Sequence, residues 1–293
     1  MFSIAKKVST QFGAKITPQL LRQPRIACYK LDRAFLSSSL DDDDDFKPQS
    51  PKEITIEIAE GIADTTQFYM RYGLSRQRLE HLAQSEQPVL HKWQKMMEVF
   101  LMTQVHVIGS IGYTANEQGL SKYAQDLQSC LQKADPDVQK VLTDIRRDTW
   151  REMVATAFSL DVVDIPTLGI VDARNHMHKV ASKMMEPSVL LEIQTQSSKI
   201  SHDDPEIELQ LKHQVLQNVI INQVYLGGSP SLVEELGFGS GGEGYAKMQC
   251  AMSDHEGDPL VGEYAAAAMV RIWQSAGIDI SSITGGAPGS PPM

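Results

Sequence analysis

The longest stretch of helical hydrophobic periodicity lies in residues 87–113. Apolar side chains recur there at steps of three and four residues, at Val89, Leu90, Trp93, Met97, Phe100, Leu101, Val105 and Ile108. More apolar residues lie off that line, at Val99, Met102, Val107 and Ile111. A helix that is apolar nearly all round must be covered on most sides. The pattern therefore predicts the central helix of an all-helical core.

Capping residues mark most of the other predicted helices. An Asp or Ser stands directly before a proline at Ser50, Asp135, Asp204 and Asp258. These pairs predict helix starts, because Asp and Ser accept free N–H groups and proline suits the first helical position. The caps together predict an all-α fold, an irregular multi-helix bundle of about nine to eleven helices with a C-terminal helical hairpin. Residues 54–58 also alternate like a strand, which stays open as a second interpretation.

Composition divides the chain into segments. Residues 51–277 form the predicted helical domain, with a possible internal hinge in the glycine-rich stretch 227–244. Residues 41–50 include five consecutive aspartates, which repel one another and predict an acidic disordered linker. Residues 278–293 are rich in Gly, Ser and Pro, which predicts a disordered tail.

Residues 1–40 have the composition of a mitochondrial transit peptide. They carry seven Lys and Arg residues against Asp32 alone, a net charge of +6, and are rich in Ser and Thr. Phe2, Val8 and Phe12 can share one face of a basic amphipathic helix. The stretch 33–38, Arg-Ala-Phe-Leu-Ser-Ser, also resembles the processing site of matrix presequences. The segment predicts a mitochondrial matrix protein.

Two other interpretations of this segment remain open. One is a basic tail on a cytosolic protein, and the other is a chloroplast address. A secretory signal is not indicated, because no long apolar run follows the first charges.

Charge and cysteine usage narrow the classes of partner. The whole chain carries a net charge of −10, so residues 41–293 carry −16. Such an acidic body disfavours nucleic acid as a partner. The three cysteines are scattered singly, which indicates neither a disulfide framework nor a zinc module and fits a reducing compartment. The predicted central helix carries Lys92, Lys95 and Glu98, so no membrane span is expected.

The densest group of functional side chains lies in residues 172–179. Asp172 and His176 are four residues apart and share one helix face, so they could ligate a metal or a small ligand with Lys179 nearby. A metal site in a helical protein takes three or four ligands, usually from a second helix as well. The other interpretation is a solvated face with apolar residues buried behind it, namely Ile170, Ala173, Met177, Val180 and Met184.

A second acidic group lies in the predicted loop 254–258. Asp254, His255 and Glu256 are weak candidates for cation binding. Asp and Gly are also ordinary turn residues, and Asp258 is expected to cap the following helix. We therefore predict no metal site and no cofactor.

Residues 237–242 match GxGxxG by letter. A dinucleotide-binding fold needs this motif between a strand and a helix, whereas here it follows a predicted short helix, which favours a hinge. Free N–H groups near Gly242 and Gly244 could still bind a phosphate at the start of the next helix.

These observations predict a mitochondrial helical scaffold, an accessory subunit or assembly factor that contacts other proteins of a larger assembly. No catalytic residues are predicted. The alternative is a helical enzyme or small-ligand protein with a site around Asp172 and His176.

Overall fold

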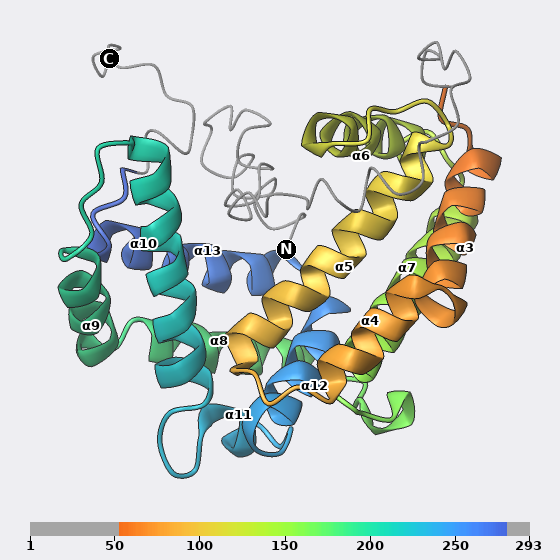
Figure 1. The fold of residues 1–293 in the computed structure, drawn as a ribbon. Coiled ribbons are helices and arrows are strands. Elements are labelled where there is room, and N and C mark those ends of the chain that lie inside the picture. The colour runs from red at the N-terminus through yellow and green to blue at the C-terminus, as the bar shows by residue number, and fades with distance from the viewer. Residues whose placement is uncertain (1–52, 280–293) are drawn as a thin grey trace, which may run out of the picture. The chain divides into compact units, whose positions relative to one another are not determined.

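In the computed structural model, residues 53–279 are described, and they form eleven α-helices and no strand (Figure 1). The predicted all-α, multi-helix fold is confirmed for this part of the chain. The predicted transit peptide and acidic linker, residues 1–50, lie outside the described residues, as does the predicted tail beyond residue 279.

The described chain divides into two compact units after Asp164. We refer to residues 53–164 as the first unit and to residues 165–279 as the second unit. The segment 227–244, predicted as a possible internal hinge, lies within the second unit. It belongs to that unit's core because Val233 and Phe238 are buried.

The first unit is built from five α-helices. They are α3 (Ile56–Tyr72), α4 (Leu74–Ala83), α5 (Val89–Gly109), α6 (Glu117–Leu131) and α7 (Pro136–Ala157), followed by the 3-10 turn η2 (Val162–Asp164). Helices α3, α4, α5 and α7 pack against one another, and α6 packs against α5 and α3 (Figure 1). A buried cluster joins α3, α5, α6 and α7 through residues that include Ile62, Ile108, Tyr123 and Leu142.

Helix α5 matches the predicted central helix, but its buried face is rotated from the expected line. The buried side chains include Met96, Val99 and Thr103, whereas Trp93 and Phe100 remain partly exposed. Both aromatic rings contact Trp150 of α7 edge-on. Large rings are seldom buried completely, so the smaller side chains occupy the interior.

The second unit contains six α-helices and one π-helix. They are α8 (Ile170–Met184), α9 (Pro187–Ser197), α10 (Pro205–Val219), the π-helix η3 (Ile220–Tyr225), α11 (Leu232–Glu235), α12 (Gly241–Ser253) and α13 (Pro259–Ser275). Helices α12 and α13, predicted as a C-terminal helical hairpin, follow one another in the chain, but α13 packs mainly against α8 and α9 instead of against α12. Helix α9 packs against α10, and η3 contacts α8, α9 and α11.

Three of the four predicted caps hold in the structure, and the start of α3 differs. Asp135, Asp204 and Asp258 each accept an N–H group at the start of α7, α10 and α13. Helix α3 begins after Thr55, five residues beyond the predicted cap, so residues 56–58 are helical and the strand interpretation is wrong there. Helix α6 begins after Asn116, whose Oδ1 accepts from Gly119 N at 3.0 Å.

Within residues 53–279, none of the helices combines the length and the apolar character that crossing a membrane requires.

Candidate functional site

Helix α8 presents the predicted cluster on its outer side. Asp172 and Lys179 are exposed, while Ala173, Val180 and Met184 are buried behind them. Ile170 was expected in that buried set, but it lies in the first turn of the helix and is exposed. The helix therefore has the amphipathic form of a solvated face over a packed one.

His176 lies half-buried against the glycine-rich loop. Its ring meets that of Phe238 edge-on, with centroids 5.5 Å apart and planes at 75°. Burial is the largest effect on the pKa of His176 and lowers it from 6.5; the charge of Asp172 raises this pKa and that of Lys179 lowers it. Its Nδ1 is buried and has no hydrogen-bond partner among the described residues. The ring is thus held mainly as an apolar contact for Phe238.

No group of three His, Cys, Asp or Glu side chains in residues 53–279 is placed to hold a metal ion. Asp172 and His176 share a face, as their spacing predicts, and no hydrogen bond joins them within the described chain. Lys179 lies on the exposed side of the same helix. These three residues can act on a ligand only together with groups from another element.

The loop between α12 and α13 is hydrogen-bonded to α8 and to the segment before it. Asp258 Oδ1 accepts from Leu260 N and Val261 N, both at 3.1 Å, which caps α13. The Arg174 guanidinium binds the same carboxylate through two hydrogen bonds. His255 Nε2 donates to the carbonyl of Leu168 at 2.9 Å, because that carbonyl can only accept.

Asp254 and Glu256, the other two metal candidates in this loop, are half-buried beside His255. Since His255 donates to Leu168, its role is to fasten the loop to the segment before α8. The arrangement is the one expected of a structural turn.

The glycine-rich loop is shaped by close packing. A Cβ atom at Gly244 would lie 2.1 Å from the carbonyl oxygen of Gly239, so only glycine fits there. Gly244 is buried, and its N–H donates to Ser240 O at 3.1 Å inside the helix. Its N–H is therefore not free for a phosphate. Gly242 is half-buried in the first turn, next to Glu243, whose negative charge disfavours an anion there.

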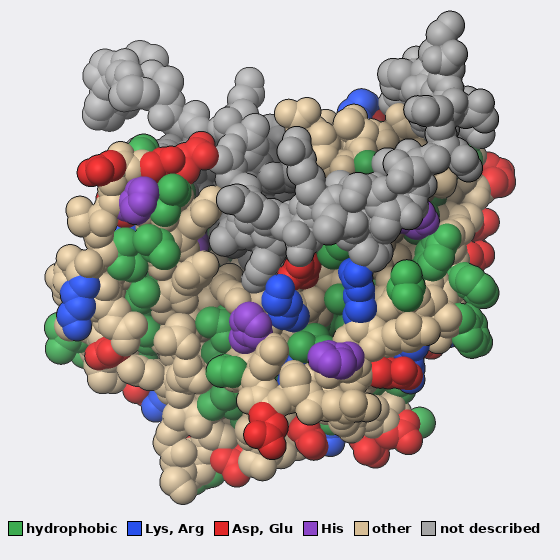
Figure 2. Space-filling view, in the orientation of Figure 1, with side chains coloured by type: hydrophobic (Ala, Val, Ile, Leu, Met, Phe, Trp, Pro, Cys, Tyr) green, Lys and Arg blue, Asp and Glu red, His purple; other side chains and the backbone are tan. Residues whose placement is uncertain are grey.

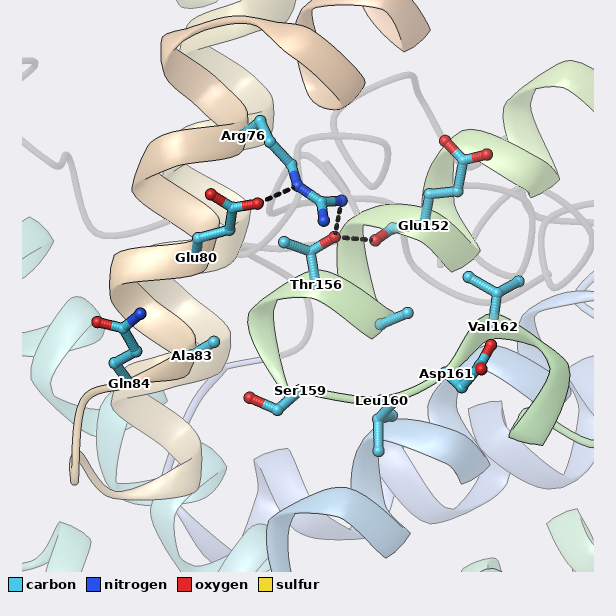
Figure 3. Close-up of a pocket in the computed structure, with 11 residues that line it drawn as sticks. Arg76, Glu80, Ala83, Gln84, Glu152, Thr156, Ser159, Leu160, Asp161 and Val162 are labelled. Carbon is cyan, nitrogen blue, oxygen red and sulfur yellow. Dashed lines mark hydrogen bonds and ion pairs between the residues drawn. The ribbon is translucent and has the colours of Figure 1, made fainter.

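A polar cleft of about 550 Å³ lies between α4 and α7 in the first unit (Figure 3). Arg76 reaches across it, donating from Nε to Glu80 Oε1 at 2.7 Å and from Nη1 to Thr156 Oγ1 at 2.6 Å. The Thr156 hydroxyl donates to the backbone carbonyl of Glu152 at 2.7 Å. That hydroxyl is bound to a carbonyl and not to a base, so the contacts join α4 to α7 without activating a nucleophile.

The floor of this cleft is the end of α7. Ser159 adopts a positive φ of 56°. Leu160 N donates to Ala155 O at 2.8 Å and Ser159 N to Thr156 O at 3.4 Å, which is the Schellman arrangement. The strained residue thus ends a helix, and the hydrogen bonds account for its conformation.

The outer face of α3 carries large apolar side chains that the protein leaves in solvent. Phe68 is 57% exposed and Tyr72 is 72% exposed, and Leu74 at the start of α4 is 61% exposed. The rings of Phe68 and Tyr72 contact each other with centroids 5.4 Å apart. Figure 2 shows hydrophobic side chains gathered over the part of the surface that α3 and α4 form. We refer to Phe68, Tyr72 and Leu74 as the aromatic surface.

An ion pair between Arg71 and Glu152 holds α3 against α7 next to the aromatic surface. The guanidinium of Arg71 donates two hydrogen bonds to the carboxylate of Glu152 on α7, from Nε to Oε2 at 2.6 Å and from Nη2 to Oε1. Such a bidentate pair orients both helices as well as neutralising both charges. The aromatic surface is therefore presented on a helix that is tied firmly to its neighbour.

Sequence reasoning did not single out the aromatic surface. A signal was present, because Phe68 and Tyr72 are one turn apart and fall opposite the line that α3 buries, which comprises Ala59, Ile62, Thr66 and Met70. Without the position of that buried line, the two rings cannot be assigned to the outside.

Comparison of this chain with known protein families, with curated proteins and with solved structures found no match.

Proposed function

We propose that this protein is a helical scaffold, an accessory subunit or assembly factor of a larger mitochondrial complex, and that the aromatic surface on α3 and α4 is one of its contact surfaces. The observation that carries the proposal is the exposure of Phe68 and Tyr72 side by side on α3, with Leu74 also exposed at the start of α4, on two helices that pack against α7.

Exposed apolar groups of this size are unfavourable in water, since each ring loses the stabilisation that burial would give it. Neighbouring exposed aromatic residues commonly mark surfaces that are buried by a partner. Aromatic side chains are also the residues that most often dominate the energy of protein interfaces. The proposal assigns the aromatic surface that role.

The mitochondrial part of the proposal is supported by the basic, Ser- and Thr-rich composition of residues 1–40. A fusion of the full chain to a fluorescent protein tests it directly. We expect the fusion to colocalise with mitochondria and to run at a lower mass than its precursor; a fusion that stays in the cytosol at precursor mass contradicts this part.

Native gel electrophoresis of mitochondrial extracts tests the contact surface. We expect the wild-type chain to migrate well above the mass of one chain, which is at most the 32.5 kDa of the full sequence, and the double variant Phe68→Ala/Tyr72→Ala to shift toward the monomer. The matched control is Val171→Ala/Leu191→Ala, which removes two apolar side chains of the second unit that are 64% and 63% exposed. Migration of the wild type at monomer mass overturns the proposal.

A further inference from the structure

The exposed side of α3 forms one continuous line of residues. Glu57, Gly61, Asp64, Phe68 and Tyr72 follow one another at steps of four, three, four and four residues, which keeps them on a single helix face. This line, which we call the outer line of α3, lies opposite the buried residues of the same helix. It therefore runs the length of the helix and continues the aromatic surface toward the N-terminal end.

Gly61 stands in the middle of this helix without a structural reason for being glycine. It is exposed, its φ is not in the left-handed region, and a Cβ atom built there would meet nothing within 4 Å. Glycine inside a helix lowers stability relative to alanine. No steric contact within residues 53–279 requires glycine at this position, whereas glycine does permit close approach by a second backbone.

Glu57 and Asp64 lie on either side of Gly61, one turn away in each direction. Both are exposed, and no Lys or Arg of residues 53–279 forms an ion pair with either. Arg71, the nearest cation along the helix, is already held by Glu152. Within residues 53–279, the N-terminal half of the outer line therefore carries two carboxylates without a paired cation, and the C-terminal half is aromatic.

We propose that the outer line of α3 receives a basic amphipathic helix from another protein. This inference rests on the proposed function and names the chemistry of the partner. The partner helix crosses α3 at Gly61, sets Lys or Arg side chains beside Glu57 and Asp64, and lays an aliphatic side chain against Phe68 and Tyr72.

A helix fits this surface better than an extended strand does. The N–H and C=O groups of α3 are bonded within the helix, so the surface has no free backbone edge to which a strand could be added. Two helices pack by setting the ridges of one into the grooves of the other, and a glycine deepens the groove at the crossing point.

A second copy of this chain fits less well. A parallel pair of α3 helices brings the carboxylates together, and an antiparallel pair places Glu57 and Asp64 beside rings or other carboxylates. In either case the acidic groups are covered without a cation, which costs free energy. Opposite charge on the partner removes that cost and also selects against wrong partners.

Fluorescence anisotropy with two labelled 18-residue peptides tests the inference on the full chain. The first peptide is an amphipathic helix of Leu, Ala and Lys, and the second carries Glu in place of every Lys. We expect the Lys peptide to bind at least tenfold more tightly, with affinity that falls as salt rises. Equal binding of the two peptides overturns the assignment of a basic partner.

Variants locate the binding on α3. Glu57→Gln/Asp64→Asn should weaken binding of the Lys peptide about tenfold, whereas Glu235→Gln/Glu263→Gln, which removes two exposed carboxylates of the second unit, should leave it unchanged. Gly61→Ala should weaken binding about tenfold while raising the melting temperature, so that a loss of binding cannot be attributed to unfolding. Unchanged binding by Gly61→Ala overturns the crossing at that residue.

The outcomes separate this inference from the proposed function. If Phe68→Ala/Tyr72→Ala lowers the native mass in extracts while the charge and Gly61 variants have no effect, the contact surface stands and the basic helix is rejected. If the full chain sediments as a dimer that Gly61→Ala dissociates, the occupant is a second copy and the inference is overturned.

Discussion

Arg174 of α8 binds Asp258 at the start of α13 through two parallel hydrogen bonds, Nε to Oδ1 at 3.1 Å and Nη2 to Oδ2 at 2.8 Å. The same carboxylate caps α13 by accepting from Leu260 N and Val261 N. A single side chain thus starts one helix and holds it to another. Its bond to the Arg174 guanidinium is the largest of the effects that lower the pKa of Asp258, to about 2.

The depressed pKa predicts acid sensitivity of the second unit. Because Asp258 has a lower pKa in the folded state, its contribution to stability is complete above the unfolded value of 3.8 and is lost as pH falls toward about 2. We expect Asp258→Asn, which keeps a good N-cap, to flatten the pH dependence of unfolding between about pH 4 and pH 2. Denaturant titrations across this window, with Arg174→Gln as the matched variant, measure it; an unchanged slope in both contradicts the assignment.

His176 should respond to its two charged neighbours in opposite directions. Burial lowers its pKa below 6.5, so its contribution to stability is present above that value and declines as pH falls through the lowered folded pKa. We expect Lys179→Gln to raise the pKa of His176 and Asp172→Asn to lower it further, as read from NMR titration of the ring protons. Shifts of the same sign in both variants would show that the three groups are not coupled as described.

The same residues provide a test of the alternative ligand-binding function. Elemental analysis of the purified protein and of His176→Ala should give the same metal content if His176 serves as a packing partner of Phe238. Stoichiometric metal in the wild type that disappears in the variant would instead favour a metal-dependent function.

Gly244 and Gly61 should react in opposite ways to the same substitution. We expect Gly244→Ala to destabilise the protein by at least about 2 kcal/mol, because its new methyl group would lie 2.1 Å from a backbone oxygen. Gly61→Ala should stabilise it by about 0.5–1 kcal/mol, since the space there is open and the helix gains propensity. Urea unfolding of both variants measures the contrast, and the same sign in both would contradict the described packing.

Replacing Ser159 with a residue that tolerates a positive φ should raise the stability of the protein. Glycine relieves the left-handed conformation at φ 56° but adds freedom to the unfolded chain, so we expect Ser159→Gly to stabilise the protein by up to about 1 kcal/mol. The control is Ser198→Gly at the end of α9, where φ is −66° and glycine brings no relief. Thermal unfolding distinguishes them; a Ser159→Gly variant that melts lower than the wild type contradicts the argument.

Much of the helical framework was predictable because caps are local. The side chains of Asp135, Asp204 and Asp258 reach only their own first turns, so sequence alone specifies the contact. The rotation of the buried face of α5 was not predictable in this way. It depends on Trp150, about fifty residues further along the chain, which meets Trp93 and Phe100 and keeps them at the edge of the core.

At the candidate sites, too, contacts between residues far apart in the sequence could not be predicted. Asp172 and His176 were placed on one face by their spacing, but the contact of His176 with Phe238 joins residues far apart in sequence. The reverse holds for Phe68, whose exposure follows from which side of α3 the neighbouring helices cover. Polar clusters are easy to find in a sequence, whereas an apolar residue that stays outside is identified only once the core is known.

The π-helix η3 is a point in the second unit where the chain can lose one residue without rotating the residues that follow. Four of its six side chains are buried, and Leu226 N bonds Ile221 O, five residues back. Deleting the exposed Asn222 would convert the wide turn into ordinary helix and leave the following residues in phase. The same deletion in α8 would turn every later side chain of that helix by about 100°. A one-residue deletion is therefore tolerable in η3 and damaging in the helices around it.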